Sequence, residues 1–107
     1  MVQQLTVKQL HDWLSREGGR PVILDVREPW ELQVCALPDS RHIPMRQIPL
    51  RVAELDPEAE LVVVCHHGIR SQQVANYLDR QGFGRIYNLR GGVDAWAREI
   101  DPGMATY

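Results

Sequence analysis

The sequence has few cysteines and no long apolar run, and each scarcity excludes a class of protein. Only two cysteines, Cys35 and Cys65, occur in 107 residues, too few for the disulfide framework of a small secreted domain, although one bridge between them is arithmetically possible. No apolar run approaches the roughly 20 residues that a membrane-spanning helix needs. The N-terminal residues 1–13 lack the basic start and apolar core of a signal peptide. We therefore expect a soluble protein of the reducing cytoplasm that does not bind membranes.

An excess of charge of either sign is also missing. The formal net charge of −2 at pH 7 argues against a generic nucleic-acid binder, because such proteins are normally basic. A chain of 107 residues is close to the commonest domain size and buries enough apolar surface to fold without a disulfide or a structural metal. Repeats, linkers and low-complexity tracts are absent. We expect residues 1–107 to form one domain.

Short apolar runs alternate with helical patterns along the chain. A capping box of Thr6 and Gln9 starts the first helix, and Gly18 and Gly19 stop it. Further helices are expected at 28–34, 48–55, 71–81 and 93–100, and strands at 21–27, 61–65 and 86–89, with a weaker strand at 41–44. Strands that alternate with helices predict an α/β fold: a small, mainly parallel open sheet with helices on both faces.

A cysteine closes the most apolar of the expected strands. Cys65 ends the run 61–65, and a helix is expected from Ser71 onward. In open parallel sheets, ligands bind beyond the carboxyl ends of the strands. The few residues between strand and helix must curl, so their N–H groups can form a nest of donors beside the positive end of the helix dipole. Such a loop stabilises a thiolate, and Arg70 adds a permanent positive charge.

Two other interpretations of this loop compete with a nucleophile. Cys65 could be a structural residue buried at a strand end, since free cysteine is among the most buried residue types. Alternatively, Cys65 could share a zinc ion with His66, His67 and either His42 or Cys35. Adjacent residues chelate one tetrahedral ion poorly and the chain has no second paired-ligand motif, so we expect no metal.

The length of the loop indicates whether it would bind a phosphate group or a sulfur atom. A cysteine phosphatase needs five residues between its nucleophile and its arginine, whereas only four residues, 66–69, separate Cys65 from Arg70. The shorter loop makes a smaller ring of amides, suited to one sulfur atom rather than to a tetrahedral phosphate. A cysteine that carries a sulfur anion or its persulfide is therefore favoured.

Three segments in a fixed order resemble one known family. Residues 24–31, LDVREPWE, resemble the first signature of the rhodanese-homology superfamily, and residues 65–71, CHHGIRS, match its active loop and the residue that follows. Residues 82–83, GF, and 89–96, LRGGVDAW, match its closing pattern. The sequence thus resembles the single-domain rhodaneses, which are sulfurtransferases, over nearly its whole length.

The resemblance implies a mechanism and a set of site residues. Cys65 would take a sulfane sulfur from a donor such as thiosulfate, become a persulfide, and pass the sulfur to a thiophilic acceptor. Cyanide serves as acceptor in assays, and a thiol or another protein in cells. The loop that would hold the sulfur through its amides comprises His66, His67, Gly68, Ile69, Arg70 and Ser71. The resemblance implies no cofactor, and the expected partners are a small sulfur donor and a thiol or protein acceptor.

The chain departs from the family after Glu31. The family usually has G-H-I-x-G-A there, whereas residues 35–40 read CALPDS. The family's histidine therefore has no counterpart in this sequence, and we do not assign its role to His42. We expect Asp25 and Arg27 to be structural, with Asp25 capping amides and Arg27 paired with Glu31 or Glu28. We expect Cys35 to be a packing residue rather than one that resolves an oxidised Cys65.

Two other functions remain open on this scaffold. One is a non-catalytic carrier that receives persulfide from a partner and ignores thiosulfate. The other is a cysteine phosphatase or an arsenate reductase, which the loop length disfavours. The tail 101–107 is similar to tails of rhodanese domains fused to molybdopterin- and thiamine-pathway activating enzymes, which points to protein acceptors.

Overall fold

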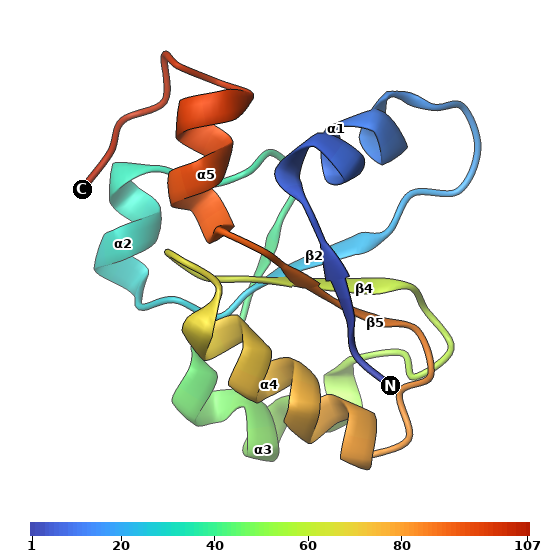
Figure 1. Cartoon of the computed structure of the whole chain (residues 1–107). Coiled ribbons are helices and arrows are strands. Elements are labelled where there is room, and N and C mark those ends of the chain that lie inside the picture. The colour runs from blue at the N-terminus through green and yellow to red at the C-terminus, as the bar shows by residue number, and fades with distance from the viewer.

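A five-stranded parallel sheet organises the chain, which the computed structural model describes from Met1 to Tyr107. The strands lie in the order β1-β5-β4-β2-β3. Their bounds are β1 Gln3–Leu5, β2 Val22–Asp25, β3 Arg41–His42, β4 Leu61–Val64 and β5 Ile86–Leu89. Helices cover both faces, as Figure 1 shows. The expected α/β class with a parallel sheet is confirmed.

The central strand β4 is buried on both faces, which explains its unbroken apolar sequence. Leu61, Val63 and Cys65 belong to one core cluster, and Val62 and Val64 belong to a second. This alternation follows from the two-residue period of a strand. Cys65 therefore continues the direction of Leu61 and Val63, at the carboxyl end of the strand in the middle of the sheet.

The helices divide between these two core clusters. The side of Cys65 is covered by α3 (Ile48–Arg51) and α4 (Ile69–Arg80), through Ile48, Val74 and Leu78. The opposite side is covered by α1 (Val7–Ser15) and α5 (Gly92–Glu99). The short helix α2 (Pro29–Val34) follows β2 at the edge where the active loop also lies. No helix is both long and apolar enough to cross a bilayer.

Local sequence signals fix the helix starts. The predicted capping box is present: Thr6 Oγ1 accepts from the Gln9 amide at 3.1 Å, and the Gln9 side chain accepts from the Thr6 amide at 2.9 Å. The expected helix 28–34 begins instead at Pro29, with Glu28 as its N-cap. The expected helix 71–81 begins two residues earlier, at Ile69, after Gly68 with φ of +100°. The loop between β4 and α4 is therefore shorter than predicted.

Three expectations about the remaining elements are wrong in detail. The edge strand β1 was not expected, because three residues beside a strong helix start carry no strand period. The expected strand 41–44 contains only Arg41–His42, although the amides of Ile43 and Met45 still donate to the carbonyls of Asp25 and Val26. The expected helix 48–55 is one turn of α-helix, α3, between the 3-10 turns Met45–Gln47 and Val52–Glu54.

Candidate active site

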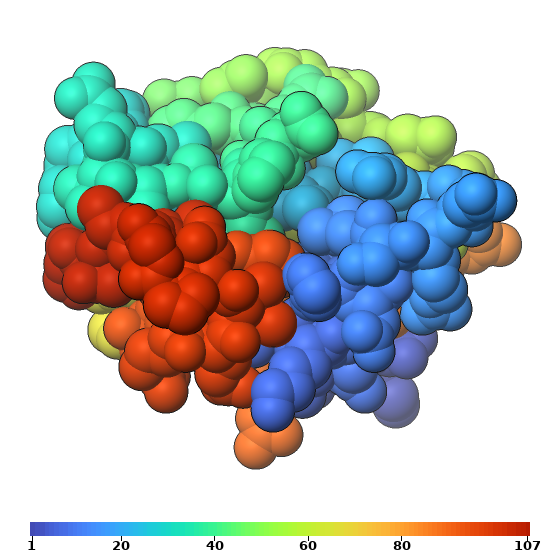
Figure 2. Space-filling model, turned by 90° about the horizontal axis from the view of Figure 1, so that it is seen from above, coloured from blue at the N-terminus to red at the C-terminus, as the bar shows by residue number.

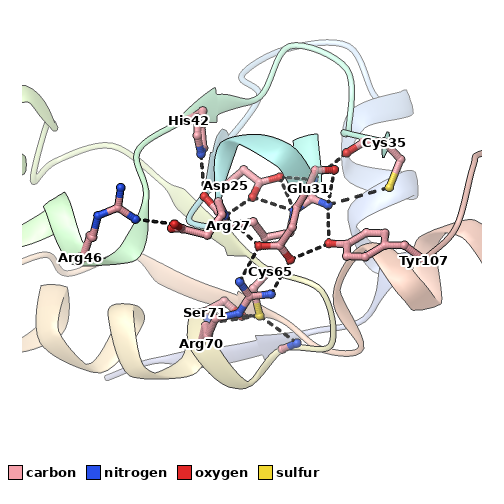
Figure 3. Close-up of polar contacts among 12 residues, drawn as sticks. Asp25, Arg27, Glu31, Cys35, His42, Arg46, Cys65, Arg70, Ser71 and Tyr107 are labelled. Atoms are coloured by element: carbon pink, nitrogen blue, oxygen red, sulfur yellow. Dashed lines mark hydrogen bonds and ion pairs between the residues drawn. The ribbon is translucent and has the colours of Figure 1, made fainter. Parts of the chain in front are cut away.

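The sulfur of Cys65 lies in a cradle of hydrogen-bond donors, as expected of the loop. Its Sγ accepts from the backbone amides of Gly68 at 3.1 Å and Ser71 at 3.3 Å, and lies 3.2 Å from Ser71 Oγ (Figure 3). Cys65 is only 1% exposed. Because both amides belong to the turn that opens α4, the positive end of the helix dipole also faces the sulfur.

A buried asparagine in β5 supports this cradle. Asn88 Oδ1 accepts from Ser71 Oγ at 2.5 Å, and Asn88 Nδ2 donates to the Gly68 carbonyl at 3.3 Å and to Gln4 Oε1 at 2.9 Å. Both loop residues that donate amides to the sulfur are thus held by one side chain. Sequence reasoning missed Asn88, although asparagine is depleted in strands and its place within β5 was a usable signal.

The start of α5 fixes the other side of the loop. The amides of Val93 and Asp94 donate to the carbonyls of Cys65 and His66, both at 3.0 Å. Gly91 and Gly92 have φ of +82° and +59°, in the left-handed region that favours glycine. A side chain at Gly92 would collide with the same two carbonyl oxygens. The glycine therefore permits a close approach of two backbones.

Replacing Gly92 with alanine is expected to displace the active loop. The added Cβ would overlap the carbonyls of Cys65 and His66 in a left-handed conformation, at a cost of about 2 kcal/mol. We expect lower stability and faster reaction of the Cys65 thiol with an alkylating agent in the folded protein, because a displaced loop uncovers a thiol that is buried in the unsubstituted protein. Gly18→Ala, whose Cβ would meet no atom, is the control for the cost of positive φ alone. Equal effects of the two substitutions would contradict the steric account.

Arg70 does not provide the free positive charge that the sequence suggested. Its guanidinium makes a two-pronged ion pair with Glu31 of α2, with Nη1–Oε2 at 2.8 Å and Nη2–Oε1 at 2.9 Å. Hydrogen bonds from Arg70 hold the pKa of Glu31 at about 2, well below its ordinary 4.5. The pair joins the end of the active loop to α2. Glu31, not singled out as a site residue from the sequence, is 3% exposed.

This ion pair should make stability depend on pH in the acid range. Because the folded pKa of Glu31 is lowered, its contribution is complete above 4.5 and is lost as pH falls towards 2. We expect Glu31→Gln to lower the free energy of unfolding by about 2 kcal/mol at neutral pH and to flatten this acid dependence. Urea unfolding of both proteins across that pH range tests it. Parallel acid profiles for the two proteins would contradict this assignment.

Asp25 and Arg27 form a second, fully buried ion pair. Arg27 Nη2 lies 2.7 Å from Asp25 Oδ2, and the exposed fractions of the two side chains are 0% and 1%. Asp25 Oδ1 also accepts from the Arg27 amide at 3.0 Å, which agrees with the capping role expected of it. The expected partners of Arg27 were wrong: Glu31 pairs with Arg70, and Glu28 pairs with Arg46. Sequence spacing alone favoured the neighbours on α2.

The rings of the two loop histidines lie close together and are tilted against each other. Their ring centroids lie 4.0 Å apart with an interplanar angle of 31°, and burial lowers the pKa of His66. The ligand atoms of His66, His67 and Asp94 lie within 4.8 Å of one another. His66 and His67 are adjacent in sequence, and adjacent residues chelate one tetrahedral ion poorly. Asp94 is also paired with Arg98. These contacts favour a packing role for the two rings over metal binding.

The remaining candidate residues lie outside the sulfur cradle. Both cysteines are free, and Cys35 packs against the core cluster on the face of the sheet opposite Cys65. His42 Nε2 contacts the Arg27 carbonyl at 2.6 Å. Ile69 opens α4 and is 70% exposed. Apart from Cys65, the loop residues that contact the sulfur directly are Gly68 and Ser71.

These features define an α/β protein whose active loop is built around one thiol at the carboxyl end of a central parallel strand. The rhodanese-like domain family matches residues 6–99. A sulfurtransferase of Allochromatium vinosum is 43% identical over 105 residues, covering 98% of this chain and 97% of that protein. The thiosulfate sulfurtransferase GlpE of Pseudomonas aeruginosa is 42% identical over 87 residues, covering 81% and 77%.

A solved structure and a longer relative are also similar to this chain. A rhodanese-like domain protein of Staphylococcus aureus superposes with a TM-score of 0.82 at 29% identity, covering 98% of both chains. The chain spans 38% of the length of a chloroplastic rhodanese-like/PpiC domain-containing protein of Arabidopsis thaliana, to which it is 37% identical. The chain belongs to the rhodanese-like family, and it is a sulfurtransferase.

Proposed function

We propose that Cys65 is the sulfur-carrying nucleophile and that residues 66–71 form the loop that binds the transferred sulfur. The observation that carries this proposal is the pair of backbone amides, from Gly68 and Ser71, that donate to Cys65 Sγ. A thiolate attacks the outer sulfur of a donor, the bond to the donor's leaving group breaks, and a persulfide remains on Cys65. An acceptor thiolate then attacks the outer sulfur and regenerates the Cys65 thiolate.

The pairing of Arg70 favours sulfur over phosphate as the transferred group. Both of its terminal nitrogens are bound to Glu31, so the guanidinium faces α2 and not a substrate oxyanion. A phosphatase or arsenate reductase would need that arginine on the anion. The amides alone suit an outer sulfur that carries a single negative charge.

We propose thiosulfate as the small donor and a thiol or a protein thiol as the acceptor. GlpE of Pseudomonas aeruginosa, a relative of this chain, is a thiosulfate sulfurtransferase. The two free cysteines fit a reducing compartment such as the cytoplasm. The reaction proposed needs no cofactor and no metal ion, because the thiol supplies the nucleophile and the loop supplies the donors.

One observation favours a second candidate, a carrier that receives persulfide from a protein donor. Thiosulfate is a dianion, yet the one cation of the active loop is neutralised by Glu31. A donor that presents its persulfide directly would need no such cation. The two candidates share Cys65 and differ only in which donor loads it.

A donor panel with mass readout tests both candidates. The protein is incubated with thiosulfate, mercaptopyruvate or a cysteine desulfurase with its cysteine substrate, and the Cys65 peptide is weighed before and after a thiol is added. We expect thiosulfate to add the mass of one sulfur atom, which the thiol removes. Loading by the desulfurase alone would replace the first candidate with the second. No adduct from any donor would overturn the proposed role of Cys65.

A further inference from the structure

The last residue of the chain lies against the active loop. Tyr107 lies outside residues 6–99, the range that the rhodanese-like domain family matches. Figure 2 shows the red C-terminal segment against the blue-green segment that contains α2, and Figure 3 shows the Tyr107 ring directed towards Glu31 and Arg27. The contacts of this one side chain divide into those of its ring and those of its hydroxyl.

The ring of Tyr107 covers the first residue after the nucleophile. Its centroid lies 3.9 Å from that of the His66 imidazole with an interplanar angle of 9°, a parallel stack. The ring of Trp30 in α2 lies 5.6 Å from the same ring, centroid to centroid, at an interplanar angle of 73°. His66 is thus held between His67 and Tyr107, and the contact fixes the start of the loop.

The hydroxyl of Tyr107 reaches the other end of the loop through one intermediate residue. It donates to Glu31 Oε1 at 2.8 Å and accepts from Arg27 Nη1 at 2.8 Å. Glu31 in turn holds Arg70, the residue before Ser71, with both carboxylate oxygens. Burial raises the pKa of Tyr107 to about 12, so the hydroxyl keeps its proton and stays a donor at neutral pH.

We propose that Tyr107 is a positioning residue for sulfur transfer, which fastens both ends of the active loop at once. Its ring holds His66 at the start, and its hydroxyl holds Glu31, which fixes Arg70 at the end. The inference rests on the proposed function, because the positioned loop is the one that binds the sulfur. Tyr107 itself does not touch the reacting sulfur.

Fastening the loop matters because two backbone amides must stay aligned on one atom, the sulfur of Cys65. The Gly68 amide lies between the two fastened residues, His66 and Arg70, and the Ser71 amide directly follows Arg70. These amides donate to Cys65 Sγ at 3.1 and 3.3 Å. Donors that are already aligned need no reorganisation when charge moves onto the outer sulfur. A loop released at both ends must be ordered in each transfer, which slows the step without removing any catalytic group.

Two substitutions separate the ring from the hydroxyl. Tyr107→Phe keeps the stack on His66 and removes both hydroxyl contacts, and we expect the single-turnover rate of Cys65 persulfidation to fall about threefold to tenfold. Tyr107→Ala removes both sets of contacts, and we expect a fall of about thirtyfold or more. Tyr87→Phe is the matched control: its hydroxyl contacts Glu60 at 3.3 Å, away from the loop, and its rate should be unchanged.

Two readouts need no sulfur donor, so they keep this proposal separate from the proposed function. The first is the His66 pKa measured by NMR: Tyr107→Ala exposes the imidazole, so the lowered pKa should rise towards its ordinary value, while Tyr107→Phe should leave it unchanged. The second is the rate of Cys65 alkylation, followed by peptide mass at a temperature where each variant is fully folded. A loosened loop should raise that rate in Tyr107→Ala.

Each outcome decides the proposal. A folded Tyr107→Ala protein with the persulfidation rate, His66 pKa and alkylation rate of the unsubstituted protein would overturn it. A rate lost in proportion to the unfolded fraction, with His66 unchanged, would also overturn it, since that is what a purely structural tail predicts. If the unsubstituted protein accepts sulfur from no donor, the proposed function fails, and the His66 and alkylation measurements still decide whether Tyr107 fastens the loop.

Discussion

Replacing Cys65 with serine is expected to lower kcat/KM for sulfur transfer at least about a thousandfold, since the proposed covalent intermediate then cannot form. Serine preserves the small polar shape, and its hydroxyl can accept from the amides of Gly68 and Ser71 that now reach the sulfur. A hydroxyl is far less nucleophilic than a thiolate, and it forms no persulfide. The fold should therefore persist while transfer disappears.

The measurement is steady-state transfer from thiosulfate to cyanide, with far-UV circular dichroism to confirm folding. Cys35→Ser is the matched control, because Cys35 packs against the core cluster on the other face of the sheet, and its thiol contacts Arg27 Nη1 at 3.9 Å rather than the sulfur of Cys65. It should retain nearly full activity. Substantial transfer by Cys65→Ser, or equal losses in the two variants, would show that Cys65 is not the sulfur carrier.

Replacing Asp25 with asparagine is expected to cause the largest loss of stability, about 3–5 kcal/mol. The substitution leaves the Arg27 guanidinium buried without its counter-charge, in a site where that side chain has no exposure. The other acceptors of Arg27 are neutral: the Cys35 carbonyl at 2.8 Å, the Glu31 carbonyl at 3.4 Å and the Tyr107 hydroxyl at 2.8 Å. None of them replaces the carboxylate.

Urea unfolding followed by fluorescence of the three tryptophans measures this loss. Glu54→Gln is the control, because Glu54 pairs with Arg41 and Arg51 in solvent, where ion pairs contribute little. Its free energy of unfolding should change by less than about 1 kcal/mol. A comparable loss in both variants would mean that burial does not govern the Asp25–Arg27 pair.

The position of Cys65 and the strand that carries it could be predicted because both depend on local sequence. An apolar run of β4 that ends at Cys65 places the residue at the carboxyl end of a central strand, and Gly68 supplies the turn that opens α4. The capping box of α1 was visible for the same reason: Thr6 and Gln9 are three residues apart. Such local patterns can be recognised without knowing which residues distant in sequence pack against them.

The supporting residues could not be predicted because their partners lie far away in sequence. Arg70 and Glu31 are 39 residues apart, and Tyr107 and Glu31 are 76 apart. Whether an arginine faces a substrate or a glutamate depends on where α2 docks, which no local pattern specifies. The sequence therefore predicted a free cation at Arg70 where the structure has a neutral pair.

The single proton of the Ser71 hydroxyl links the charge on the sulfur to a distant edge of the sheet. Ser71 Oγ lies 2.5 Å from Asn88 Oδ1 and 3.2 Å from Cys65 Sγ, and one proton cannot serve both. A neutral thiol can donate to Ser71 Oγ while the Ser71 hydroxyl donates to Asn88 Oδ1, whereas a sulfur anion competes for the hydroxyl proton. Asn88 also donates to Gln4 in β1, so the NMR signals of the Asn88 and Gln4 side-chain amides should change with the charge on the Cys65 sulfur.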